Sequence, residues 1–158
     1  MKVGVALPHY DFSYPDGRKA DLEATISFAR RAEELGFDSV WISDHFFLDL
    51  SRYGGAPERH RSLEALTTLS SIAVETERVR LGTLVLCEAF RHPPVLAKMA
   101  TTLDIVSNGR LDLGLGAGEQ GGRIVYSGSL DGLMHESRSL TSKYLRQELA
   151  IPVTSARR

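Results

Sequence analysis

Apolar positions along the first part of the chain follow two alternating patterns. Short, nearly continuous apolar runs at 2–7, 39–43, 79–86 and 110–115 predict buried strands. Between them, apolar residues recur at helical spacing over about 21–35, 62–76 and 93–108, and charged residues occupy the remaining faces. Apolar strands that alternate with amphipathic helices predict a parallel sheet covered by helices.

The ends of the predicted helices carry residues with suitable local chemistry. A side-chain oxygen can cap the first turn, proline suits that turn, and glycine or asparagine permits a left-handed stop. These residues are Asp21 and Ser62 as caps, Pro93 and Pro94 in a first turn, and Gly36 and Asn108-Gly109 as stops. The predicted buried stripes are Leu22, Ile26, Ala29 and Ala32 in the first helix and Leu63, Leu66, Leu69, Ile72 and Ala73 in the second.

Two architectures share this order of elements, a doubly wound sheet and a (β/α) barrel. A doubly wound sheet carries its glycine fingerprint after the first strand. Here the glycines at 114, 116 and 118 follow the fourth strand, and Glu119 replaces the last glycine of the fingerprint, so we favour the barrel. These glycines leave room for a flat cofactor or for close packing of the backbone. Barrel chemistry lies at the carboxyl ends of the strands, where His9, Asp44, His45, Glu88 and Glu119 fall.

Composition narrows the class of protein. The 158 residues suit one domain, and the formal charge of −1 gives no attraction to nucleic acid or to anionic membranes. No apolar run approaches the roughly 20 residues that span a bilayer. Met1 leads directly into a strand without a secretory signal, so we expect a soluble cytoplasmic protein. Cys87 is the single cysteine, which excludes an internal disulfide and predicts an isolated buried thiol.

Three segments together resemble the luciferase-like monooxygenases. They are GFDSVWISDHF at 36–46, RLGTLV at 80–85 and the block from Arg91 to Gly118. The resemblance implies a TIM barrel and oxidation of a small organic substrate, with reduced FMN and oxygen or with the deazaflavin coenzyme F-420 as hydride carrier. A full barrel needs about 250 residues. We therefore expect residues 1–118 to supply about four βα units, the amino-terminal half of a barrel.

The resemblance also implies roles for individual residues. His45 would lie beside the cofactor ring, where an imidazole donates a hydrogen bond or shuttles a proton, and Asp44 would orient it. A structural histidine and an ordinary turn aspartate are the alternatives. Glu119 is similar to an acid that protonates a substrate or intermediate. The implied cofactor-binding residues are Thr83, Leu84 and Val85, at a strained bulge or in plain barrel core, and Gly116, Ala117 and Gly118 at the next strand end.

The remaining histidines give no sign of a metal site. His9, His60, His92 and His135 lack metal-ligand spacing, so we assign no metal.

Residues 119–158 resemble the end of the first ATPase module of the damage-recognising subunit of bacterial excision repair, with a seam at 116–118. A strand at 123–126, a turn at Gly128 and helix caps at Ser129 and Ser139 are expected there, covering the open barrel edge. The tail has no Walker phosphate loop to support an ATPase.

These observations give one principal interpretation and two alternatives. The chain is interpreted as a truncated or chimeric luciferase-like oxidoreductase, with domains at 1–118 and 119–158 and weak or no turnover alone. The first alternative is a noncatalytic half-barrel that dimerises, and the second is a DNA-repair fragment. Because exposed strand edges favour pairing with another chain, we expect a homodimer, with a small-molecule substrate as its other partner.

Overall fold

The computed structural model describes residues 1–116, 124–137, 139–146 and 148–149. Ala117, Gly118 and Glu119, three of the predicted site residues, therefore lie outside the described residues. The strands are β1 (Gly4–Ala6), β2 (Ser39–Ile42), β3 (Phe47–Asp49), β4 (Arg59–Arg61), β5 (Arg80–Thr83), β6 (Leu86–Cys87), β7 (Leu111–Gly116) and β8 (Ile124–Ser129). The α-helices are α1 (Leu22–Glu34), α2 (Ala65–Ala73), α3 (Pro93–Val106), α4 (Leu130–Leu133) and α5 (Leu140–Leu145), and short 3-10 helices are η1 (Asp11–Ser13), η2 (Leu50–Tyr53) and η3 (Glu88–Phe90).

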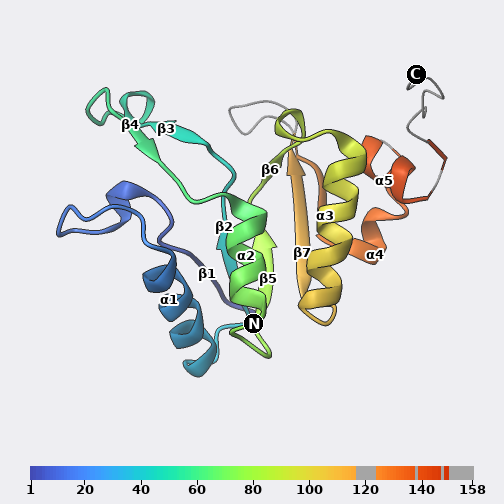
Figure 1. Cartoon of the computed structure of the whole chain (residues 1–158), viewed down its shortest axis with the longest axis horizontal. Helices are drawn as coiled ribbons and strands as arrows, with labels where there is room; N and C mark the ends of the chain where they lie inside the picture. The colour runs from blue at the N-terminus through green and yellow to red at the C-terminus, as the bar shows by residue number, and fades with distance from the viewer. Residues whose placement is uncertain (117–123, 138, 147, 150–158) are drawn as a thin grey trace, which may run out of the picture.

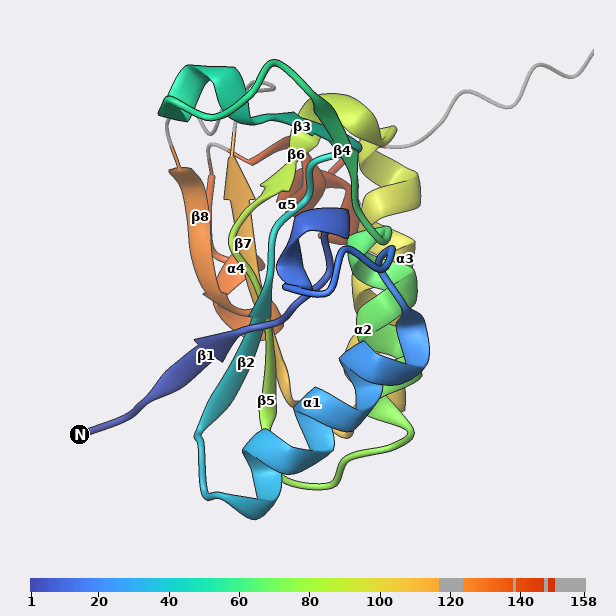
Figure 2. The ribbon, with the colours of Figure 1, turned by 90° about the vertical axis from the view of Figure 1, so that its left-hand side faces the viewer.

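The main sheet confirms the predicted parallel arrangement. Strands β1, β2, β5 and β7 follow one another in parallel, and β6 pairs with β7 beyond the end of β5 (Figure 1). Val40, Leu81 and Leu111 are neighbours in this register and are fully buried. Figure 2 shows α1, α2 and α3 on one side of the sheet, as the barrel prediction requires. A doubly wound sheet would carry helices on both sides.

The first and third helices end where the sequence predicted. Asp21 caps α1 by accepting a hydrogen bond from the amide of Glu23 at 2.9 Å, and Gly36 takes a φ of 83° after the helix. Helix α3 begins at Pro93 and is followed by left-handed Asn108 and Gly109. The prediction that Leu22 is buried was wrong, because it opens α1 and is 40% exposed.

The second helix begins later than predicted. Its cap is Glu64, whose carboxylate accepts from the amide of Thr67 at 2.7 Å, and not Ser62. Ser62 instead donates its hydroxyl to the carbonyl of His45. Leu63 accordingly precedes the helix, and its amide donates to the carbonyl of His9 at 3.0 Å. Hydrogen bonds to the carbonyls of His9 and His45 therefore hold residues 62–63 outside the helix, although their apolar spacing is helical.

Two further segments differ from the prediction. The run at 79–86 is not one strand but two, β5 and β6, and the peptide between Leu84 and Val85, which is cis, lies between them. The loop after β2 contains an antiparallel hairpin, β3 and β4, in which Leu48 pairs with His60. Figure 1 shows this hairpin projecting beyond the carboxyl end of β2.

The tail covers the outer edge of the fourth strand of the sheet. Strand β8 runs antiparallel to β7, with Leu115 opposite Tyr126. Ser129 caps α4 through the amide of Gly132 at 3.2 Å, and Ser139 Oγ accepts from the amide of Ser142 at 3.4 Å, as expected. Gly128 lies within β8 and not in a turn, so that prediction was wrong. Helix α5 packs against α3.

Candidate active site

The sequence-predicted residues gather at the carboxyl edge of the parallel sheet. His9 follows β1, Asp44 and His45 follow β2, and Leu84 and Val85 follow β5. Parallel strands all end at the same edge, so these side chains come from neighbouring positions although they are far apart in sequence. This is the edge at which (β/α) barrels carry their chemistry.

Asp44 is buried in an ionic network. Its carboxylate accepts two hydrogen bonds from the Arg91 guanidinium, at 2.5 and 2.8 Å, and one from the amide of Cys87 at 3.0 Å. Arg91 also donates to Glu64, the cap of α2. Asp44 therefore binds Arg91 and Cys87 rather than the ring of His45, the partner that the resemblance suggested.

The charges in this network are mutually stabilised. Burial acts to lower the pKa of Arg91, but its hydrogen bonds to Asp44 and Glu64 raise that pKa well above its ordinary value. Burial acts to raise the pKa of Glu64, and the amide of Thr67 together with Arg91 lowers it overall. The network ties the ends of β2 and β6 to the start of α2, so it fixes the backbone that presents His45.

His45 is partly exposed beside an aromatic cluster. Its ring lies 6.4 Å from the Tyr10 ring, centroid to centroid, and Tyr10 stacks on Phe12 at 4.8 Å. Its carbonyl is held by Ser62. The next residue, Phe46, is 46% exposed and stacks on Phe90 at 4.2 Å. The imidazole is thus accessible at the strand end, as a group that contacts a ligand must be.

A hydrogen-bonded trio that the sequence analysis did not assemble lies next to His45. His9 places Nδ1 2.8 Å from the carbonyl oxygen of Leu7 and Nε2 3.0 Å from Ser43 Oγ. The Tyr10 hydroxyl lies 2.5 Å from the same Ser43 Oγ. Burial is the main cause that lowers the pKa of His9. The available signal was the position of His9-Tyr10 and Ser43 directly after two adjacent strands.

The glycines of β7 serve close packing. A Cβ at Gly114 would lie 2.3 Å from the Thr83 carbonyl oxygen, and one at Gly116 would lie 2.7 Å from Val85 Cγ2. Thr83 Oγ1 also donates to the Gly114 carbonyl at 3.0 Å and accepts from its amide at 2.9 Å. Of the two possibilities left open by the sequence, close packing therefore accounts for both positions. Leu84 differs from its neighbours, because this residue is 59% exposed.

Glu88, at the end of β6, is a half-buried acid. Among the described residues its Oε1 is buried without a hydrogen-bond partner. Burial raises the pKa of this carboxyl, and a hydrogen bond with Ser139 opposes that rise only in part. Among all the residues that the structure describes, no three or more metal-ligating side chains form a group, and no helix is long and apolar enough to cross a bilayer.

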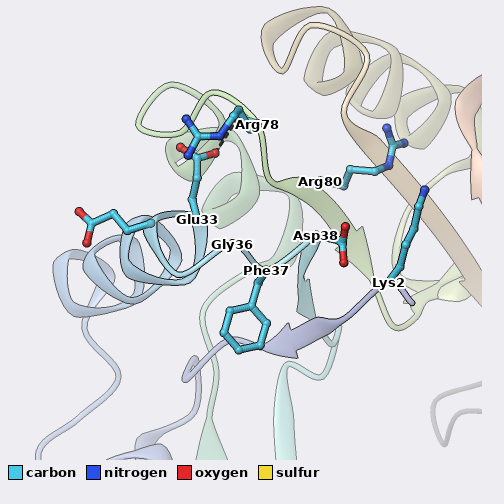
Figure 3. Close-up of a pocket in the computed structure, with 8 residues that line it drawn as sticks. Lys2, Glu33, Gly36, Phe37, Asp38, Arg78 and Arg80 are labelled. Atoms are coloured by element: carbon cyan, nitrogen blue, oxygen red, sulfur yellow. Dashed lines mark hydrogen bonds between the residues drawn. The ribbon is translucent and has the colours of Figure 1, made fainter.

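A polar cavity of about 420 Å³ lies at the opposite, amino edge of the sheet. Figure 3 shows residues that line it, among them Glu33, Asp38, Arg78 and Arg80. Glu33 accepts backbone amide hydrogens from Arg78 and Val79, at 2.6 and 2.7 Å. Asp38 accepts from the amide of Val3 at 2.6 Å. These carboxylates hold the loops of the fold, and none of the predicted site residues lines this cavity.

Comparisons with known proteins agree with the resemblance to the luciferase-like monooxygenases. The luciferase-like monooxygenase family matches residues 1–136. The F-420-dependent glucose-6-phosphate dehydrogenase of Amycolatopsis mediterranei is 43% identical over 104 residues, which are 65% of this chain and 29% of that protein.

Solved structures give the same result. A monooxygenase from Streptomyces bottropensis is 34% identical with a TM-score of 0.53, covering 73% of this chain and 33% of that one. The oxygenating constituent of 3,6-diketocamphane monooxygenase from Pseudomonas putida, in complex with FMN, is 26% identical with a TM-score of 0.58 over 75% of this chain and 30% of that one. The chain thus spans about a third of the length of its relatives.

Proposed function

The chain belongs to the luciferase-like monooxygenase family, and on that premise we propose that it is the amino-terminal part of an FMN- or F-420-dependent oxidoreductase. Its parent activity would be oxidation of a small organic substrate. The supporting relatives include an F-420-dependent dehydrogenase and an FMN-bound monooxygenase. The observation that carries the proposal is the meeting of His45, Ser43 and Leu84 at one carboxyl edge.

The residues at this edge fit a flat heteroaromatic ring. Leu84 presents an exposed apolar side chain at the cis peptide that ends β5, which offers a contact surface for a ring face. His45 and Ser43, both partly exposed at the end of β2, offer polar groups for the ring edge or the substrate. When bound, the cofactor would supply a hydride acceptor or activate oxygen. His45 would contribute a hydrogen bond or a proton near neutral pH.

The same edge is only partly built by this chain. TIM barrels commonly hold phosphate with loops after strands seven and eight, which are not among the described residues. Water is also excluded poorly by an open edge, and hydride transfer needs a fixed geometry. We therefore expect weak cofactor binding and weak or no turnover from this chain alone.

A cofactor titration tests the proposal. Coenzyme F-420 and FMN are titrated separately into the protein, and quenching of cofactor fluorescence is followed. We expect weak binding of one of them, reduced further in Leu84→Asp and unchanged in Ile105→Asp, a matched change at a 74% exposed position of α3. Micromolar affinity would contradict the expected weakness. Equal binding by Leu84→Asp and the wild type would contradict the assignment of this edge.

One observation favours a second candidate, a noncatalytic half-barrel, although it closes the β7 edge to pairing with another chain. In a regular barrel the fourth strand pairs with a fifth parallel strand. Here antiparallel β8 occupies that edge of β7 from Asp112 to Gly116. A mass measurement in solution that gives a dimer, together with the absence of binding of either cofactor, would favour this candidate over the oxidoreductase.

A further inference from the structure

The trio of His9, Ser43 and Tyr10 has a defined direction of hydrogen bonding. The Leu7 carbonyl can only accept, so the proton of the neutral His9 ring lies on Nδ1. Nε2 is then an acceptor, and the Ser43 hydroxyl donates to it across 3.0 Å. Because Ser43 has a single proton, the Tyr10 hydroxyl is the donor in the 2.5 Å contact with Ser43 Oγ.

Ser43 is the member of the trio that a ligand can reach. His9 is 3% exposed and Tyr10 is 8% exposed, whereas Ser43 is partly exposed. A serine oxygen has two acceptor positions, and Tyr10 occupies one of them. While His9 is neutral, Ser43 therefore offers a ligand one acceptor position and no donor. A hydroxyl group suits this site, and a carbonyl group does not.

We propose that Ser43 and His9 form the proton acceptor for the oxidation of an alcohol substrate, an inference that rests on the proposed function. The alcohol donates its hydroxyl to Ser43 Oγ. As the carbon-bound hydrogen leaves with its electron pair for the oxidised cofactor, the hydroxyl proton passes to Ser43 Oγ. The original Ser43 proton passes to His9 Nε2. The products are a carbonyl compound, the reduced cofactor and a His9 imidazolium, so protons and electrons balance.

Proton transfer also reverses the polarity of the site. Protonated His9 donates from Nε2 to Ser43 Oγ, which frees the Ser43 hydroxyl to donate to the new carbonyl oxygen. The site therefore accepts from the alcohol before the reaction and donates to the carbonyl after it. Such a change matches the hydrogen bonding of the site to the group that is present at each stage.

The surroundings of His9 support a neutral resting ring. Burial is the largest influence and lowers the pKa of His9, and the charge of His45, which follows β2, lowers it further. The Leu7 carbonyl opposes both effects, and a hydrogen bond to the backbone of Ser43 opposes them more weakly. The other groups packed near it, Tyr10 at 4.1 Å between ring centroids and Ser43, are uncharged near neutral pH. His9 is thus ready to accept a proton.

The test measures His9 directly and needs no turnover. Long-range ¹H–¹⁵N spectra of the whole chain give the tautomer and the pKa of His9, with 2-propanol and acetone as probes. We expect the proton on Nδ1. We also expect acetone to raise the pKa of His9, because a carbonyl binds only the protonated state; 2-propanol, which can donate to Ser43 or accept from it, should change that pKa less. Ser43→Ala should abolish the acetone shift, and Ser71→Ala, a partly exposed hydroxyl on α2, should preserve it.

A proton on Nε2, equal shifts with both probes, or shifts that persist in Ser43→Ala would overturn the inference. The cofactor titration separates it from the proposed function. If the cofactor binds and the acetone shift is absent, the proton acceptor is wrong and the proposed function stands. If the acetone shift is present and neither cofactor binds, the ligand site at Ser43 stands and the cofactor assignment is wrong.

Discussion

The buried contact between Arg91 and Asp44 offers a sharp test of how this edge is held together. The side chains are 9% and 1% exposed, and Arg91 makes two hydrogen bonds to Asp44. Arg91→Met removes the guanidinium but keeps an unbranched apolar side chain. Asp44 then retains only the amide of Cys87 among its hydrogen-bond donors described above. The substitution leaves a buried carboxylate without its cation.

The expected loss of stability follows from two estimates. Hydrogen bonds to charged groups contribute about 1.5–3 kcal/mol each, and Arg91 makes two to Asp44 and one to Glu64. Removing one partner of a buried ion pair costs about 3–5 kcal/mol. Both estimates describe the same contacts, so they are not added. We take the ion-pair value and expect Arg91→Met to lose about 3–5 kcal/mol, a large part of the stability of an ordinary domain.

Urea denaturation at neutral pH, followed by circular dichroism, measures this loss. The double variant Asp44→Asn/Arg91→Met is the matched control, because it removes the stranded charge and should recover part of the stability. A loss below about 0.5 kcal/mol in Arg91→Met, the value typical of an exposed site, would refute the buried network. So would a double variant that is less stable than the single one.

Two further predictions concern neighbouring strand ends. Gly114→Ala should lose about 1–3 kcal/mol in the same assay, because the added Cβ would lie 2.3 Å from the Thr83 carbonyl oxygen; unchanged stability would disprove this close approach. Burial raises the folded-state pKa of Glu88 above 4.5, so the stability that its neutral form contributes is complete at lower pH and is lost as the pH rises through the raised pKa. The free energy of unfolding of Glu88→Gln should therefore rise relative to that of the wild type between acidic and neutral pH. A difference that falls over this range would contradict the raised pKa of Glu88.

Local chemistry let the sequence determine much of the architecture. The caps of α1 and α3 act within a few residues of the helix end, so Asp21 and Asn108-Gly109 predicted those boundaries correctly. The nearly continuous apolar strands predicted a parallel sheet, because strands buried on both faces lack the alternation of polar and apolar residues. The carboxyl edge as the site of His45 followed from the order of elements.

Only the tertiary structure decided the partners of the polar groups. Asp44 and Arg91 are 47 residues apart, so no local pattern links them. The expected contact of Asp44 was the ring of His45, and its carboxylate binds Arg91 and the amide of Cys87 instead. Arg110 would suit the surface by composition, yet it is 9% exposed and donates to the carbonyls of Ala73 and Val79.

The same limit applies to the backbone at the site. The antiparallel direction of β8, the cis peptide after Leu84 and the seating of Gly114 against Thr83 depend on neighbouring strands. A residue's own chemistry sets which hydrogen bonds it can make. The chain brought beside it by folding sets which of them it does make, and the bonding of His9 to Ser43 is the clearest case in this protein.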